Sequence, residues 1–198
     1  MPGVRPQLIL ASASPRRREL LAEAGYDFVV RPPHEDAECG RRAGESPAEL
    51  VARLARQKAA DVAGRCHSGL VLGCDTVVEC CGQVLGKPQD RSHARQMLEV
   101  LRGHEHRVYS GLCLWAASGD RHRVRVAMTR LVMTPISDQQ LEGYLGTGDW
   151  QGKAGAFGYQ DGHDWLQILE GSESNVVGLP LELLDEMLLA WERDTNRG

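Results

Sequence analysis

The most informative stretch of the chain is Leu8-Ile9-Leu10-Ala11-Ser12-Ala13-Ser14-Pro15-Arg16-Arg17-Arg18-Glu19-Leu20-Leu21. It predicts a strand, a tight loop and a helix, because Ser14 is a favourable N-cap, Pro15 suits the first helical position and Gly25 is placed to end the helix. Free amides at a helix N-terminus, serine hydroxyls and arginine side chains together favour a phosphate ligand. An ordinary capped helix with solvated arginines is the alternative, and the residue types alone do not decide between the two.

Length and charge limit the classes of protein to consider. The 198 residues, 42% of them hydrophobic, suffice for a single domain, 1–198, with a real core. A net charge of −4 argues against a nucleic-acid or membrane partner, so an anion site would have to be local. No apolar run reaches the roughly 18 residues of a membrane helix, and residues 1–7 lack a signal-peptide core. We therefore expect a cytoplasmic protein.

Cysteines and histidines show no spacing typical of a metal site or a disulfide framework. The six cysteines include one adjacent pair, Cys80-Cys81, and no CxxC, which favours reduced structural thiols. The seven histidines are expected at the surface, including His104 and His106 just after Gly103.

Hydrophobic periodicity and turn signals predict alternating strands and helices. The expected strands are 26–30, 70–78, 83–85 folding back on 77–79, 107–117 and 123–133. The expected helices are one from the capping box at Ser46 to Gly64, one over 91–101, one from the capping box at Ser137 to Gly146, and one opened by Pro180.

The remaining segments are expected to be less regular. Residues 31–38 predict an acidic loop, 164–170 and 175–177 a final hairpin, and 192–198 a frayed tail. Six glycines between 146 and 162 can bring the backbone close to a ligand. With neither a repeat nor a linker, two lobes around one continuous sheet fit better than two independent domains.

Three polar residues stand out against these elements. Asp75 interrupts the apolar stretch 70–78, where a buried carboxylate needs a metal, a lysine or a helix N-terminus as partner; an Asp that satisfies loop amides fits equally well. Lys58 lies one turn after Leu54 and either extends to solvent, the commoner outcome, or reaches inward toward an anion. Lys87 lies in the constrained turn Gly86-Lys87-Pro88.

Five motifs occur in order: Leu-Ala-Ser-x-Ser-Pro-Arg-Arg-x-Glu-Leu-Leu, Leu-Ala-Arg-x-Lys-Ala, Gly-x-Asp-Thr-Val-Val, Gly-Lys-Pro and Lys-Ala-Gly-Ala-Phe-Gly-x-Gln. From Leu8 to about Leu184 the chain resembles the Maf family of nucleoside triphosphate pyrophosphatases. The resemblance implies an α/β fold with a mixed twisted sheet flanked by helices, two lobes around a central cleft, and a homodimer. It also implies hydrolysis of a nucleoside triphosphate to the monophosphate and pyrophosphate, assisted by a divalent metal, Mg²⁺ or Mn²⁺.

The resemblance also implies roles for single residues. Asp75 becomes the general base and a metal ligand, with Glu38 as a second ligand and Glu35 as its rival, because the local spacing departs from the family pattern. The residues at substrate positions are Ser12, Ser14, Arg16, Arg17, Lys58, Thr76, Lys87, Lys153 and Gln160.

A subgroup of the family that acts on dTTP and UTP carries residues like Arg17, Thr76 and Gln160, which favours a pyrimidine substrate over 7-methyl-GTP. A glutamine amide offers both a donor and an acceptor to the O4/N3–H edge that uracil and thymine share. Tyr159 and Asp161, on either side of this glutamine, depart from the family pattern and could reshape the base pocket.

Two functions other than hydrolysis fit parts of the sequence less well. A non-catalytic nucleotide-binding regulator of septum formation would bind without turnover, but such a binder needs no carboxylate like Asp75 facing a polyanion beside Lys58 and Lys87. A nucleic-acid-binding module would use the arginine cluster, but the acidic net charge disfavours it.

Overall fold

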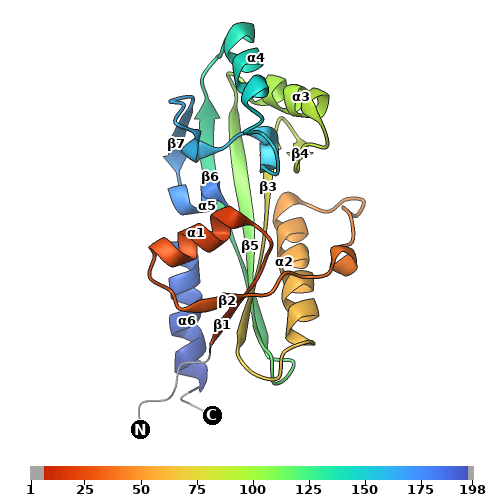
Figure 1. The fold of residues 1–198 in the computed structure, drawn as a ribbon, viewed down its shortest axis with the longest axis vertical. Helices are drawn as coiled ribbons and strands as arrows, with labels where there is room; N and C mark the ends of the chain where they lie inside the picture. Colours follow the sequence, from red (N-terminus) through yellow and green to blue (C-terminus); the bar gives the residue numbers. More distant parts are fainter. Residues whose placement is uncertain (1–6, 196–198) are drawn as a thin grey trace.

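The computed structural model describes residues 7–195 as a mixed α/β structure around one twisted sheet (Figure 1). Its strands are β1 Leu8–Ala11, β2 Phe28–Val30, β3 Leu70–Cys80, β4 Gln83–Leu85, β5 Glu105–Ala116, β6 His122–Met133 and β7 Leu166–Glu170. Its α-helices are α1 Pro15–Glu23, α2 Pro47–Ala63, α3 Arg91–Leu101, α4 Asp138–Thr147, α5 Glu173–Val177 and α6 Leu181–Thr195. Three 3₁₀ turns are η1 Glu35–Ala37, η2 Ala154–Ala156 and η3 Tyr159–Asp161. The predicted α/β class, a mixed sheet flanked by helices, is confirmed.

The sheet has the order β2-β1-β3-β5-β6-β7, and β4 adds to β3. The strand β1 is parallel to β2 and β3, whereas all other pairs are antiparallel. The long pair of β3 and β5 runs in register from Leu70 opposite Ala116 to Glu79 opposite Arg107. These two strands therefore connect both halves of the molecule (Figure 1).

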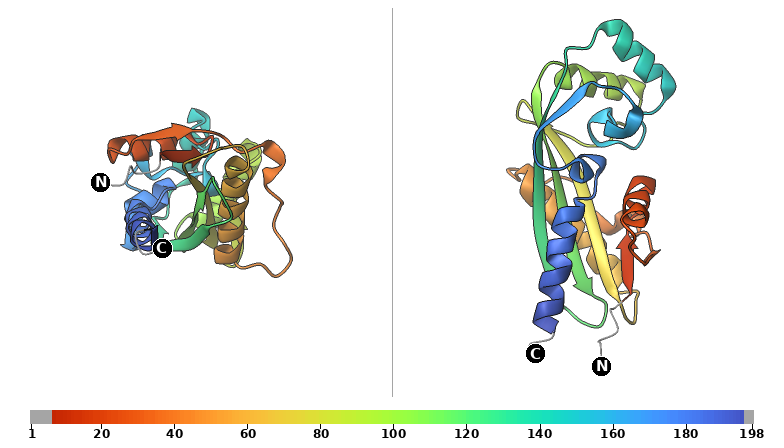
Figure 2. Two further views of the ribbon diagram at one scale, coloured as in Figure 1. Left: turned by 90° about the horizontal axis from the view of Figure 1, so that it is seen from below. Right: turned by 90° about the vertical axis from the view of Figure 1, so that its left-hand side faces the viewer.

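Alternate residues of β3 face two different layers. Leu70, Leu72 and Cys74 pack in a core with α1 and α6, while Val71 packs against Ala55 of α2 and its neighbours. Figure 2 shows α2 and α6 on opposite sides of the strands. Both faces of this half of the sheet are thus covered, as the apolar stretch 70–78 predicts.

The backbone of α2 packs directly on the sheet at two glycines. A Cβ on Gly73 of β3 would lie 2.2 Å from the carbonyl oxygen of Ala55, and one on Gly111 of β5 would lie 2.2 Å from that of Val51. Both positions therefore need the absence of a side chain. This contact fixes the height of α2 above β3, and with it the position of Lys58 one turn further along.

A second core fills the other half of the molecule, where Val78 and Cys80 pack with α3, α4 and the segment around Phe157. Between the two cores, β3 loses its neighbour on one edge. β1 pairs with β3 only as far as Gly73, and β4 begins to pair at Val78. Among the described residues, 74–77 therefore have no strand partner on that edge, and we call this segment the edge gap.

The structure corrects several expectations. Residues 173–177 form the helix α5 instead of a strand, because the Ser172 hydroxyl caps it by accepting from the Asn175 N–H. The C-terminal helix α6 continues through Thr195, so fraying from residue 192 is wrong for 192–195, and 196–198 lie outside the described residues, as do 1–6. His106 is buried, not exposed. The loop 31–38 contains the single turn η1.

Among residues 7–195, no helix is both long and apolar enough to cross a membrane.

Candidate active site

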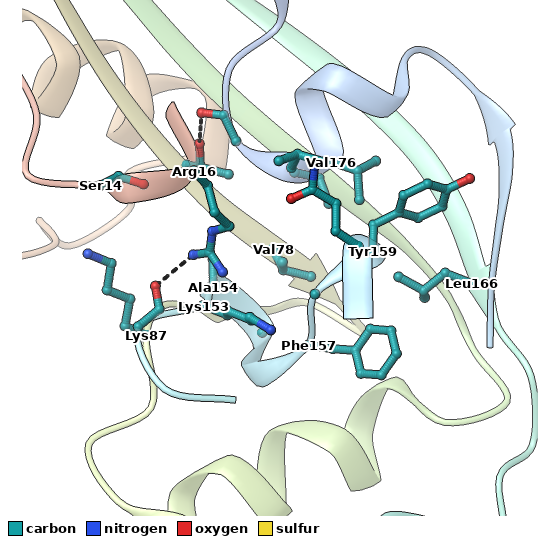
Figure 3. Close-up of a pocket in the computed structure, with 18 of the residues that line it drawn as sticks. Ser14, Arg16, Val78, Lys87, Lys153, Ala154, Phe157, Tyr159, Leu166 and Val176 are labelled. Carbon is teal, nitrogen blue, oxygen red and sulfur yellow. Dashed lines mark hydrogen bonds between the residues drawn. The ribbon is translucent and has the colours of Figure 1, made fainter. Parts of the chain in front are cut away.

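A crevice opens at the edge gap and continues between the two halves of the molecule. It has two adjoining parts, which together are lined by all the substrate and metal positions that the sequence predicts: Ser12, Ser14, Glu35, Glu38, Arg16, Arg17, Lys58, Asp75, Thr76, Lys87, Lys153 and Gln160. In Figure 3, Ser14 and Lys87 lie toward one side of this space and Phe157, Leu166 and Val176 toward the other. The crevice therefore combines a polar, cationic side with an apolar side.

Asp75 and Thr76 lie in the edge gap, and their side chains point toward opposite faces of the sheet because side chains alternate along a strand. Asp75 shares the face of Gly73 and meets α2, where Lys58 Nζ lies 2.6 Å from Asp75 Oδ1. Both side chains are nearly buried, with 12% and 10% of their surfaces exposed. The inward orientation of Lys58 is thus the less common of the two outcomes that the sequence left open.

A second carboxylate reaches the same ammonium group. Lys58 Nζ lies 3.1 Å from Oε1 of Glu38, whose side chain is more exposed than that of Asp75. The rival acidic residue, Glu35, lies in η1 and lines the outer part of the crevice, and no ion pair with Lys58 forms there among the described residues. The geometry therefore favours Glu38 as the acidic neighbour of Asp75.

The loop that carries Glu38 is held by a side chain of α2. Arg53 donates to the carbonyl oxygens of Cys39 and Gly40, at 3.1 Å each, and pairs with both carboxylate oxygens of Glu45 at 2.6 and 2.7 Å. The hydrogen bond from Arg53 lowers the pKa of Glu45 to about 2. The two residues thus anchor both ends of the short segment that follows Glu38.

Thr76 faces the opposite layer and belongs to a network around Arg17. The Arg17 guanidinium donates to the carbonyl oxygens of Gly178 and Cys74, each at 2.8 Å, to Thr76 Oγ1 at 3.0 Å and to Ser12 Oγ at 3.3 Å. Arg17 is buried. It therefore joins α1 to β3 and to the segment after α5, and most of its donors are used inside the protein.

The N-terminus of α1 faces the cationic side of the crevice. Ser14 is the N-cap residue, but its hydroxyl makes no capping bond; instead, Ser12 Oγ accepts from the Ser14 N–H at 3.1 Å. Arg16 donates to the carbonyl oxygen of Gly152 at 2.9 Å, which places its side chain across the crevice (Figure 3). Burial, followed by repulsion from Arg17, lowers the pKa of Arg16.

Lys87 completes the cationic side from the other half of the molecule. Its turn is fixed because the Gly155 N–H donates to the carbonyl oxygen of Gly86 at 3.0 Å. Loss of solvation, followed by repulsion from Arg17 and Lys58, lowers the pKa of Lys87. Burial is thus the first cause of the lowered pKa of both Arg16 and Lys87, and repulsion between like charges lowers each pKa further. An anion in the crevice would relieve this repulsion.

The donor set fits a magnesium-like cation, although it is small. Among residues 7–195 no group of three or more His, Cys, Asp or Glu side chains surrounds a common point. Asp75 and Glu38 nevertheless converge on one positive group, the ammonium of Lys58. Mg²⁺ is commonly held by one or two carboxylates together with substrate phosphates and water, so two carboxylates suffice.

The sequence does not predict some contacts that hold the site residues in place. Arg53 and Glu45 are eight positions apart, and no spacing rule connects a helix side chain to the loop before it. Tyr144 donates to Asp161 Oδ2 at 2.7 Å beside Gln160, a contact that depends on how α4 folds over the glycine-rich segment. In the sequence, the departure of Asp161 from the family pattern is the signal that points to this contact.

Fold and crevice together define an α/β protein with a cationic cleft and a carboxylate at its floor. The chain belongs to the Maf family, since the model of that family, described as Maf-like protein, matches residues 7–191. The predicted family is thereby confirmed.

Several curated proteins resemble this chain over most of its length. It is 52% identical over 191 residues to a dTTP/UTP pyrophosphatase of Rhodopirellula baltica, a match that covers 96% of this chain and 84% of that protein. It is 44% identical to a dTTP/UTP pyrophosphatase of Symbiobacterium thermophilum, with 92% of each chain covered. A solved nucleoside-triphosphatase / dITP/XTP pyrophosphatase from Mycobacterium abscessus is similar with a TM-score of 0.41 and 12% identity, over 94% of this chain and 97% of that chain.

Proposed function

We propose that this protein hydrolyses nucleoside triphosphates, dTTP and UTP above all, to the nucleoside monophosphate and pyrophosphate. The observation that carries the proposal is the convergence of Asp75, Glu38 and Lys58 with Arg16 and Lys87 on one crevice at the edge gap. The relatives named dTTP/UTP pyrophosphatase support the same reaction.

The electrostatics of the crevice suit a triphosphate. A nucleoside triphosphate carries close to four negative charges near neutral pH, which must be neutralised before a nucleophile approaches the α-phosphorus. Arg16, Lys58 and Lys87 supply positive charge from both sides of the crevice, and the N-terminus of α1 with Ser12 and Ser14 supplies N–H and O–H donors.

Asp75 acts as the general base in this proposal. It orients a water molecule and accepts its proton while the water oxygen bonds to the α-phosphorus and the bond to the bridging oxygen breaks, releasing pyrophosphate. Lys58 beside it forms an ion pair with Asp75 and contacts the phosphates in this proposal. Loss of this base should reduce the rate about 10²–10⁴-fold.

A divalent cation, Mg²⁺ or Mn²⁺, completes the site, and Asp75 and Glu38 would hold it. When bound, such a cation neutralises phosphate charge and stabilises the developing negative charge of the leaving group. The role of the protein is to keep the two carboxylates together near Lys58 and to hold the loop of Glu38 through Arg53.

Base recognition is assigned to Gln160, which lines both parts of the crevice. Its amide would pair with the O4/N3–H edge of uracil or thymine. Arg17 and Thr76, the other two residues typical of the dTTP/UTP subgroup, bond to each other and shape the wall near Gly178.

A panel of nucleotides, assayed for pyrophosphate release with Mg²⁺ and with Mn²⁺, tests the proposed function. We expect dTTP and UTP to be hydrolysed much faster than purine triphosphates. A clear preference for GTP or 7-methyl-GTP would contradict the proposed substrate. Tight nucleotide binding without any turnover would instead favour the alternative function, a non-catalytic regulator of septum formation.

The resemblance to the family further supports a cytoplasmic homodimer as the working form. Light scattering of the purified protein, at concentrations used in the assay, measures the mass directly. A dimer is expected, and a monomer at all concentrations would contradict this part of the proposal.

A further inference from the structure

Asp161 places a negative charge in a crevice that is otherwise suited to an anion. Its carboxylate binds three neighbours: Lys153 Nζ at Oδ1, and the Tyr144 hydroxyl at 2.7 Å and the Gly158 N–H at 3.1 Å at Oδ2. The side chains of Lys153 and Asp161 are 13% and 12% exposed, so the pair is largely withdrawn from solvent. A nearly buried carboxylate with three partners is held in a defined position in the site.

These contacts close the turn that carries Gln160. Gly158 is the N-cap of η3 and Asp161 is its last residue, so the bond from the Gly158 N–H to the Asp161 carboxylate spans Tyr159 and Gln160. A Cβ on Gly158 would lie 2.6 Å from Asp161 Oδ1 and from Lys153 Nζ, so the absence of a side chain there lets the ion pair form. The turn is therefore held by contacts between its own residues and Lys153.

Tyr144 connects the same turn to a rigid part of the molecule. This tyrosine is buried in the core of the second half, and its ring lies 5.0 Å from that of Phe157. Burial, followed by the hydrogen bond to Asp161, raises the pKa of Tyr144, so its hydroxyl stays a donor at neutral pH. The backbone around Gln160 is thereby attached to α4.

The ion pair also changes the role expected for Lys153. Its ammonium group already neutralises Asp161, and the pair carries no net charge. The other positive groups of the predicted set that line the crevice are Arg16, Arg17, Lys58 and Lys87. Among the described contacts, none of them forms an ion pair with Asp161. Lys153, which the sequence predicts at a substrate position, is therefore bound to the turn in this structure.

We propose that Asp161 is a positioning residue that holds the Gln160 turn and thereby sets the preference for uracil and thymine over cytosine. The proposal rests on the proposed function and deepens it. Uracil presents an acceptor at O4 and a donor at N3, whereas cytosine presents the reverse pattern. A glutamine amide on a mobile turn can rotate and serve both bases, but one on a fixed turn discriminates between them.

The test compares kcat/KM for UTP and for CTP in the wild type and three variants. Asp161→Asn removes the charge that holds Lys153, and Tyr144→Phe removes one hydroxyl without any change of charge. Asp164→Asn is the matched control, because this exposed carboxylate lies three residues further along the same segment. Melting temperatures show which variants are folded.

We expect the UTP-over-CTP preference to fall about tenfold in Asp161→Asn, and severalfold in Tyr144→Phe, with Asp164→Asn unchanged. Equal gains for UTP and CTP in Asp161→Asn, with an unchanged preference, would overturn the proposal, because they would show an effect of charge alone. If Asp161→Asn does not fold, an unchanged preference in Tyr144→Phe overturns it instead. A wild type that does not distinguish UTP from CTP would contradict the recognition of the base by Gln160 itself.

Discussion

Lys58 of α2 and Asp75 of β3 form a nearly buried ion pair, with 2.6 Å between Nζ and Oδ1, and the same ammonium lies 3.1 Å from Glu38. The lysine thus occupies a place between two carboxylates. In the absence of a bound cation the lysine reduces the repulsion between the two neighbouring carboxylates. Lys58 and a divalent cation are therefore expected to compete for Asp75 and Glu38.

Replacement of this lysine should increase the affinity for a metal ion. In Lys58→Met the two carboxylates lose their internal counter-charge, so Mn²⁺ measured by calorimetry without nucleotide is expected to bind about tenfold more tightly, while KM for UTP rises. The melting temperature should fall without metal and recover when Mn²⁺ is added, because a nearly buried carboxylate is left unpaired.

Lys87→Met serves as the comparison for that variant. Lys87 lines the same crevice but forms no ion pair with Asp75 or Glu38 among the described contacts. The Lys87→Met variant should bind nucleotide more weakly than the wild type and bind Mn²⁺ with unchanged affinity. Weaker Mn²⁺ binding in Lys58→Met than in the wild type would show that the lysine does not compete with the cation.

The loop of Glu38 depends on Arg53. Arg53→Met removes the donors to Cys39 and Gly40 and the pair with Glu45, so Glu38 should move away from Asp75. We expect Mn²⁺ affinity to fall about tenfold. Arg95→Met, which breaks exposed ion pairs with Glu99 of α3 and Glu142 of α4, is the control and should leave the Mn²⁺ affinity unchanged. Identical Mn²⁺ binding in both variants would refute a role of Arg53 at the site.

The pair of Glu45 and Arg53 also gives a pH dependence of stability. The hydrogen bond from Arg53 lowers the pKa of Glu45 from 4.5 to about 2, so the folded state favours the ionised form. The stabilisation is fully present above about pH 4.5 and is lost as the pH falls through 2. Denaturation of wild type and Glu45→Gln at several pH values should give a difference in unfolding free energy that shrinks from pH 5 to pH 2. A constant difference would contradict the prediction.

The contact of α2 with the sheet predicts a strong effect of one methyl group. In Gly111→Ala the new Cβ would lie 2.2 Å from the carbonyl oxygen of Val51, so the helix must shift and the free energy of unfolding should fall by at least about 2 kcal/mol. Gly143→Ala, on the exposed side of α4 with no atom within 4 Å, should stabilise by up to about 1 kcal/mol. Urea denaturation of both variants measures this contrast, and equal stabilities would count against the close packing.

The sequence predicts the regular elements well where local signals agree. Ser46 and Ser137 open their helices with the expected capping boxes, and Cys81-Gly82 forms the turn between β3 and β4. The strand expected at 175–177 is wrong. Val176 and Val177 favour a strand, but the capping Ser172 and Gly178 confine the chain to one short helix.

The site was harder to predict than the fold, because its geometry depends on tertiary packing. The sequence alone leaves open whether Lys58 points inward; that choice follows from α2 lying close to the sheet at Gly73 and Gly111. The choice between Glu38 and Glu35 depends on where Arg53 holds the loop. The network of Arg17 likewise depends on the segment near Gly178, which is distant in sequence.

The turnover of Asp75→Asn decides whether Asp75 is the general base. With purified protein, Mg²⁺ and UTP or dTTP, the wild type should release pyrophosphate, whereas the folded variant should still bind nucleotide and lose at least about 10²-fold in kcat. Asp120→Asn, an exposed carboxylate in the turn between β5 and β6, should match the wild type. Near-normal pyrophosphate release by folded Asp75→Asn would contradict the assignment of Asp75 as the base.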